Sequence, residues 1–201
     1  MHFLLPTLPT FMTRQILNFL AYHDYTALRP TCKCFAALWK QDLETGRMAG
    51  TLFVPKQCAT LEDAVNRVDG DDRLTTIVLG TGKHQIDGNY LEISSALHIV
   101  GNPGVANEEI AVVGGIMFMP GIPGNCHLQH LTLRQAKQFG VEGWSSFTME
   151  DVLVEQCGHD GVVAEGTGVV GRCINVEVRH CGFSGVVATN GASITLIGAK
   201  T

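Results

Sequence analysis

The sequence predicts a mostly β fold, a parallel β-solenoid that follows a small α-helical hairpin. Short strand-like segments recur at 130–134, 151–155 and 175–179, and each is followed by a glycine corner and a second apolar pair. The repeats begin 21 and 24 residues apart, a period typical of solenoids, in which each unit buries its apolar face by stacking on the next. Glycine is absent from the first 45 residues and frequent afterwards, which indicates a boundary between two kinds of structure.

Alternation within the three repeats predicts which side chains face the core. Parallel strands lie about 4.8 Å apart, so equivalent residues of successive turns form ladders. The expected inward ladders are Leu131/Val152/Val176 and Leu133/Val154/Val178. The expected outward ladders are His130/Asp151/Asn175, Thr132/Leu153/Glu177 and Arg134/Glu155/Arg179. At the corners we expect positive φ or close backbone approach at Gly140, Gly161 and Gly185, beside a stack of reduced thiols, Cys157 and Cys181.

Residues 51–129 extend the solenoid towards the N-terminus. An amphipathic helix is expected at 60–68, with Thr60 as its cap, lying over the first turn. Further short strands are expected at 76–79, 90–93, 97–100 and 110–113. The segment Met117–Pro123 breaks the pattern and is expected to form a loop. The sequence stops at 193–201 inside what should be another turn, so the domain at 51–201 is expected to be truncated at its C-terminal end.

Composition limits the partners of the chain. Residues 1–50 carry five Lys/Arg and three Asp/Glu, and the remainder carries nine and sixteen without a basic run, so nucleic acid is not an expected partner. No apolar run approaches the roughly 18 residues of a membrane span. The first six residues lack the basic lead of a signal peptide. Seven cysteines without a CxxC pair favour reduced thiols and no metal or cofactor, which indicates an intracellular protein of the cytoplasm or nucleus.

Residues 1–48 have a helical pattern. Apolar residues recur at intervals of three to four across 12–20 and 28–39, which predicts two or three short helices. About forty residues cannot bury a sufficient core alone, so this domain is expected to complete its core on a partner or on the neighbouring domain.

This helical segment resembles an F-box. It opens with Leu8-Pro9, continues with Ile16-Leu17-x-x-Leu20, and closes with Leu28 followed by Cys32-Lys33-x-Phe35. In that family the motif docks on a Skp-type adaptor of a cullin ubiquitin ligase, and the rest of the chain selects the protein to be ubiquitinated. The resemblance implies that the adaptor-facing and core groups are Leu8, Pro9, Ile16, Leu17, Leu28, Cys32 and Phe35. A plain helical cap over the open end of the solenoid is the alternative.

The following domain resembles the opening of pectin-lyase-like right-handed parallel β-helices. The shared order is a helix, then Ile77-Val-Leu-Gly-x-Gly82, short strands, and Leu97-x-Ile-Val-Gly101. Enzymes of this fold often cleave or epimerise acidic polysaccharides. The catalytic candidates here are His159, as a base, and Asp160, as its orienting carboxylate. No further acid, base or stabilising group converges on this pair in the repeat pattern, and polar residues are expected at a corner, so catalysis is not expected.

The favoured hypothesis is therefore a substrate receptor of a cullin-type ubiquitin ligase, with a Skp-type adaptor, the cullin ligase and a protein substrate as partners. The β-helix would hold the substrate near the ubiquitin-charged enzyme. The candidate substrate surface consists of His130, Arg134, Asp151, Glu155, Asn175, Glu177 and Arg179. The alternatives are a carbohydrate-active enzyme (polysaccharide lyase, hydrolase or epimerase) with a helical cap, and a structural repeat protein with no link to a ligase.

Overall fold

The computed structural model describes Met48 and residues 50–201. Within it, Phe53–Thr201 forms one compact unit. The predicted helical hairpin and all seven of its adaptor-facing candidates lie outside the described residues, and the boundary predicted between 48 and 51 is not tested. These remain predictions.

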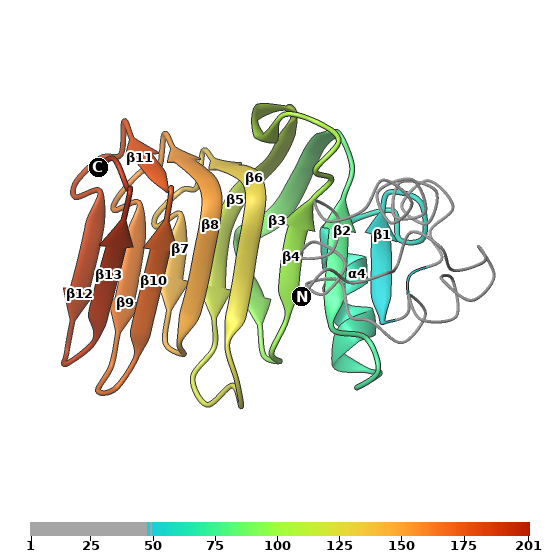
Figure 1. The fold of residues 1–201 in the computed structure, drawn as a ribbon, viewed down its shortest axis with the longest axis horizontal. Helices are drawn as coiled ribbons and strands as arrows, with labels where there is room; N and C mark the ends of the chain where they lie inside the picture. The colour runs from blue at the N-terminus through green and yellow to red at the C-terminus, as the bar shows by residue number, and fades with distance from the viewer. Residues whose placement is uncertain (1–47, 49) are drawn as a thin grey trace, which may run out of the picture. The chain divides into compact units, whose positions relative to one another are not determined.

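The described chain is a right-handed parallel β-solenoid of about six turns, which confirms the predicted class for this part of the chain. Consecutive turns stand side by side in sequence order, from β2 to β13 (Figure 1). Its strands are β1 (Thr51–Val54), β2 (Thr76–Leu79), β3 (Gly82–Ile93), β4 (His98–Gly101), β5 (Ile110–Phe118), β6 (Cys126–Arg134), β7 (Val141–Gly143), β8 (Phe147–Glu155), β9 (Val162–Glu165), β10 (Val170–Ile174), β11 (Glu177–Arg179), β12 (Val186–Thr189) and β13 (Ser193–Ile197).

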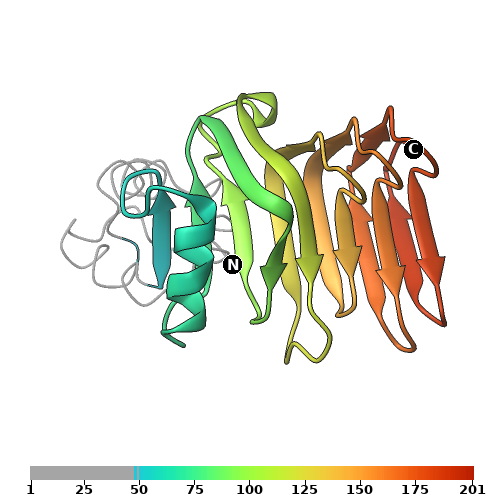
Figure 2. The ribbon, with the colours of Figure 1, turned by 180° about the vertical axis from the view of Figure 1, so that it is seen from behind.

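Three faces run along the solenoid. The first face consists of β2, β4, the beginnings of β6 and β8, β10 and β13. The second face consists of the beginnings of β3 and β5, the ends of β6 and β8, and β11. The third face consists of the ends of β3 and β5, then β7, β9 and β12. Figure 2 shows the same stack from behind.

The predicted inward ladders form the core of the second face. Leu131 pairs with Val152, and Leu133 pairs with Val154, which pairs with Val178. These five side chains are at most 4% exposed. Alternating β-branched and leucine side chains fit a pleated surface, and each turn covers the apolar row of the previous one.

The helix α4 (Leu61–Asp69) packs on the first turn, as predicted. Thr60 Oγ1 accepts a hydrogen bond from Asp63 N at 3.0 Å, which satisfies one of the free amides at the helix start. Its apolar stripe is buried, and its acidic residues bind the turn beside it: Glu62 Oε1 accepts from Asp87 N at 2.7 Å, and Asp69 accepts from Ser95 Oγ at 2.8 Å. The helix therefore covers the first turn with both apolar and polar contacts.

The structure corrects the predicted strands in two places. Met117 and Phe118 do not belong to a loop, because β5 runs to Phe118, whose side chain is fully buried. Each repeat also has a third strand that the repeat pattern did not reveal. This strand lies on the first face, and no glycine separates it from the predicted strand that follows. It consists of residues 126–129, 147–150 and 170–174 in the three repeats.

Two reasons for glycine at the corners were expected, positive φ and close backbone approach, and the structure confirms the second. Gly140, Gly161 and Gly185 do not have positive φ. A Cβ at Gly161 would lie 2.2 Å from Val178 Cγ1 and 2.6 Å from the Gly185 carbonyl oxygen, so close approach excludes a side chain. Non-glycine residues take the left-handed conformation instead, at bends where successive strands change face: His130, Gln135, Asp151, Gln156, Asn175 and His180.

Candidate protein-binding surface

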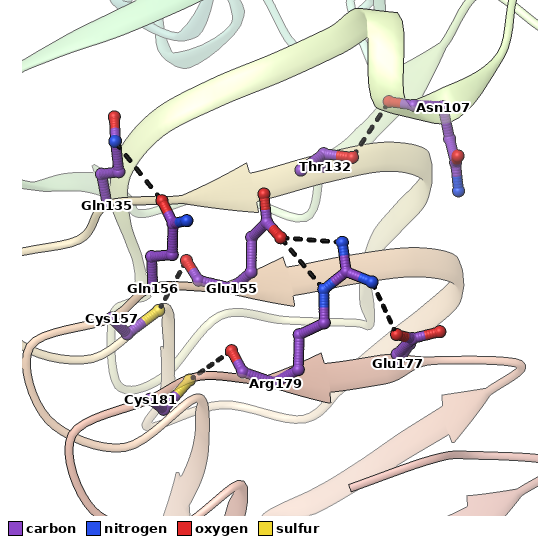
Figure 3. Close-up of polar contacts among 9 residues, drawn as sticks. All are labelled: Asn107, Thr132, Gln135, Glu155, Gln156, Cys157, Glu177, Arg179 and Cys181. Atoms are coloured by element: carbon purple, nitrogen blue, oxygen red, sulfur yellow. Dashed lines mark hydrogen bonds and ion pairs between the residues drawn. The ribbon is translucent and has the colours of Figure 1, made fainter.

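The charged ladder of the second face is satisfied at Arg179, Glu155 and Glu177, whereas the buried Arg134 Nε has no hydrogen-bond partner among the described residues. Arg134 pairs with Glu155 in register, and Glu155 pairs with Arg179. The guanidinium of Arg179 donates to Glu155 Oε2 from Nη2 at 2.9 Å and from Nε at 3.1 Å, and from Nη1 to Glu177 Oε1 at 3.0 Å (Figure 3). The hydrogen bonds that Arg179 donates to Glu155 raise the pKa of Arg179 above its ordinary value. The ladder thus holds neighbouring turns together, and its charges largely compensate one another.

The bend between the first and second faces positions three of the predicted surface residues. His130, Asp151 and Asn175 have φ of 54°, 52° and 51°. Asn and Asp tolerate this conformation better than most residues because their short side chains bond locally. Asn175 Nδ2 donates to Asp151 Oδ1 at 3.2 Å across the two turns. These residues are therefore bend formers, which explains their polar character without a ligand.

A loop covers part of the predicted surface. The 3-10 helix η3 (Asn107–Glu109) and the residues before it lie against β6 and β8. Thr132 Oγ1 donates to the Asn107 carbonyl at 3.1 Å (Figure 3), and His130 Nε2 lies 2.8 Å from the Val105 carbonyl oxygen. Thr132 is 2% exposed and Leu153 is 8% exposed.

Thr132 and Leu153 point outwards as the alternation predicts, but neither is exposed, because the η3 loop lies against β6 and β8 at this position. His130 and Asp151 are partly covered as well, since Asn107 Nδ2 donates to the Asp151 carbonyl at 3.2 Å. The more accessible predicted residues, Asn175 and Arg179, lie on later turns, away from this loop.

Two aligned thiols follow the charged ladder. Cys157 Sγ donates to the Glu155 carbonyl at 3.8 Å and Cys181 Sγ to the Arg179 carbonyl at 3.6 Å, the same local contact on successive turns (Figure 3). Both cysteines are free thiols, as expected. Burial, and to a lesser extent the neighbouring Cys181, raises the pKa of Cys157 to about 12. A thiol that does not ionise is a poor nucleophile, which is consistent with a packing role for Cys157.

The structure brings the two catalytic candidates together. His159 Nδ1 lies 2.8 Å from Asp160 Oδ2, and Asp160 Oδ1 accepts a hydrogen bond from Ser184 N at 2.6 Å. The imidazole stacks on Phe183 with ring centroids 4.0 Å apart and meets the edge of Phe139 at 5.0 Å. Asp160 is 8% exposed. Asp160 therefore orients the imidazole of His159. Both oxygens of this carboxylate already have partners within the corner, His159 Nδ1 and Ser184 N.

The first face carries a half-buried histidine pair that the sequence pattern did not indicate. His98 and His127 are in register on β4 and β6, with ring centroids 5.5 Å apart. Burial, followed by repulsion from His98, lowers the pKa of His127 to about 4. The carboxylate of Glu150 lies 3.8 Å from His127 Nε2, too far for a hydrogen bond, and does not offset the burial. His127 is therefore neutral at physiological pH.

The third face contains residues that sequence reasoning missed. Tyr90 extends over Gly115, where a Cβ would lie 2.7 Å from the tyrosine ring, and its hydroxyl donates to Gln138 Oε1 at 3.2 Å. Burial raises the pKa of Tyr90, and the nearby Glu142 carboxylate adds to this. Trp144 Nε1 donates to Glu142 Oε1 at 3.1 Å. The consecutive glycines 114–115 inside a strand were the available signal, because they mark a close approach.

Among residues 48 and 50–201, no three His, Cys, Asp or Glu side chains are grouped as metal ligands would be. None of the helices in this part of the chain is both long enough and apolar enough to span a bilayer. Comparison with protein-family models, curated proteins and solved structures found no match for this chain. The chemistry of its own residues must therefore carry the functional conclusion.

Proposed function

We propose that this chain is the substrate-recognition subunit of a cullin-type ubiquitin ligase. The observation that carries the proposal is the order of two elements in one chain. An F-box-like pattern from Leu8 to Phe35 precedes a parallel β-solenoid that presents continuous outward faces. The helical segment docks on a Skp-type adaptor, and the solenoid holds a protein substrate.

The mechanism requires no bond chemistry from this chain. Because the solenoid and the adaptor-binding segment belong to one chain, a bound substrate is present at high effective concentration near the ubiquitin-charged enzyme. The rows of in-register side chains and the α4 cover make the faces stiff, because each strand is bonded on both sides along most of the stack. The protein works inside the cell, where its five described cysteines remain thiols.

The adaptor interaction is tested by pull-down of the full chain with a Skp-type adaptor. The double variant Leu8→Asp/Ile16→Asp should lose adaptor binding, because each substitution places a charge at an apolar contact. The far-ultraviolet circular dichroism of the β-solenoid should be unchanged. The matched control is Thr81→Asp/Asn89→Asp, which introduces two charges at exposed positions downstream of the F-box-like segment. Absence of binding by the wild-type chain would refute the proposal.

A second candidate function rests on one observation, the oriented His159–Asp160 pair. A histidine with a 2.8 Å carboxylate contact has the geometry of a general base, and polysaccharide cleavage or epimerisation is the chemistry of the β-helix enzymes that this domain resembles. Incubation with alginate, pectin and chitin-type polymers tests it. Turnover by the wild-type chain that is lost in His159→Ala would establish this function in place of the receptor role.

A further inference from the structure

The third face of the solenoid has an outward row that differs from those of the other two. Glu92, Met117, Glu142, Val163 and Val187 are in register along β3, β5, β7, β9 and β12. Three of these five are apolar although they point away from the core. Outward positions in a solvated sheet are usually polar, so this row has the character of a surface that a partner covers.

The row is recessed. Val163 is 5% exposed and Glu142 is 7% exposed, although their strand neighbours on either side are the residues that face the core. Trp144, 37% exposed, stands over Glu142 and bonds to it. Tyr90 crosses from β3 over Gly115 on the other side. The aromatic side chains of Trp144 and Tyr90 thus lie beside this outward row.

The charge of this face is uncompensated. The strand segments on this face, 90–93 of β3, 115–118 of β5, and β7, β9 and β12, contain three carboxylates, those of Glu92, Glu142 and Glu165, and no Lys, Arg or His. None of the three forms an ion pair with another described residue; Glu142 bonds to Trp144, and Glu165 Oε1 accepts from Asn190 Nδ2 at 2.8 Å. On the second face, by contrast, Glu155 and Glu177 share Arg179.

From these observations we propose that the third face binds an extended basic segment of a protein partner, in which Lys or Arg residues are interspersed with apolar and small polar residues. The cations lie against the carboxylates and the exposed face of Trp144, where cation–π attraction adds to the charge pairing. The apolar residues lie on Met117 and Val187, the two apolar members of the row that are partly exposed. This inference rests on the proposed receptor role and names the chemistry of the substrate that the receptor takes.

The test uses the full chain and a fluorescein-labelled peptide of twelve residues that repeats Lys-Val-Ser, measured by fluorescence anisotropy. A peptide that repeats Glu-Val-Ser is the charge-reversed control. We expect the basic peptide to bind at least about tenfold more tightly than the acidic one, with affinity that falls as salt increases. Equal affinity for the two peptides would overturn the proposal.

A pair of variants locates the site. Glu92→Gln/Glu165→Gln removes two charges from the third face, and Glu108→Gln/Glu109→Gln removes two charges from the exposed η3 helix without touching that face. The first variant should bind the basic peptide about tenfold more weakly, and the second about as tightly as the wild type. Equal weakening in both variants would mean attraction to net charge alone and would refute the site.

Trp144 provides a local readout. Binding of an unlabelled Lys-Val-Ser peptide should change the tryptophan fluorescence of the wild type, and the change should disappear in Trp144→Phe, which leaves Trp39 in place. A change that persists in Trp144→Phe would place the peptide elsewhere. The Glu92→Gln/Glu165→Gln variant should still bind the Skp-type adaptor. Peptide binding without adaptor binding would refute the proposed function alone, and the reverse would refute this inference alone.

Discussion

At the scale of single residues, the backbone conformation at the bends of the solenoid explains many of its outward polar side chains. Among the described residues, seven that are not glycine have positive φ, and five of these are His, Asn or Asp, the types for which this conformation costs least. Several of these were predicted as surface residues for a partner. Their recurrence at equivalent positions is explained by the bends, so a polar ladder at a solenoid bend is weak evidence of a ligand.

His127 allows a residue-scale prediction about pH. Its pKa in the folded chain is about 4, against an ordinary value of 6.5. Below pH 6.5 the unfolded chain gains a proton at this side chain that the folded chain does not, so stability falls as the pH drops from 6.5 to about 4. At about 1.4 kcal/mol per pKa unit the total is on the order of 3 kcal/mol.

The titration is measured directly by NMR of the His127 ring protons, with a midpoint expected near pH 4. Urea unfolding at several pH values gives the energetic effect. His127→Gln should remove this contribution. The unfolding free energy of the wild type should therefore fall relative to that of the variant as the pH drops from 6.5 to 4. A midpoint near 6.5 would contradict the burial argument.

At the scale of elements, the corner that leads into the third face depends on close packing between turns. Gly161→Ala places a Cβ within 2.6 Å of the Gly185 carbonyl oxygen and closer still to Val178. The corner must shift, at a cost of about 1–3 kcal/mol of unfolding free energy. Gly70→Ala at the end of α4 is the matched control, because its nearest heavy atom would be 3.7 Å away. The urea midpoint should fall for Gly161→Ala and stay within error for Gly70→Ala; equal midpoints would mean that the corner accommodates a methyl group.

The sequence could predict those strands whose inward residues follow a regular apolar pattern. The second face was predictable because its inward residues are Leu and Val in strict alternation. The first face was predicted at β2 and β4 but missed in the three later repeats, because its inward row changes type there: Cys126, Phe147 and Gly171 are in register. A Cβ at Gly171 would lie 2.9 Å from Phe147 Cζ, so the glycine makes room for the ring of the preceding turn. Such complementarity between turns is not visible within a single repeat.

At the scale of the whole solenoid, the same limit applies to the candidate surfaces. Alternation correctly predicted that Thr132 and Leu153 point outwards, but their burial depends on the η3 loop, which occurs in one turn only among the described ones. The His159–Asp160 contact was foreseen because the residues are adjacent. The Tyr90–Glu142–Trp144 group was not foreseen, because Tyr90 lies two turns away from the other two and reaches them across Gly115.

The stacking of turns also predicts how the cost of a core substitution varies along the molecule. Met149, Cys173 and Leu196 occupy one inward row of the first face. Met149 is fully buried between turns, whereas Leu196 on the last described strand is 47% exposed. In a solenoid each turn is stabilised by its immediate neighbours. Met149→Ala should therefore cost about 2–5 kcal/mol, and Leu196→Ala less than about 1 kcal/mol.

Urea unfolding of the full chain followed by circular dichroism measures both values, and a low protein concentration keeps the last turn uncovered during the measurement. A cost for Leu196→Ala as large as that for Met149→Ala would mean that something packs on β13 in solution. If that cover is a second copy of the chain, the cost should fall with dilution. A concentration-independent gradient between the two sites would instead establish that the turns are stabilised by their neighbours within one chain.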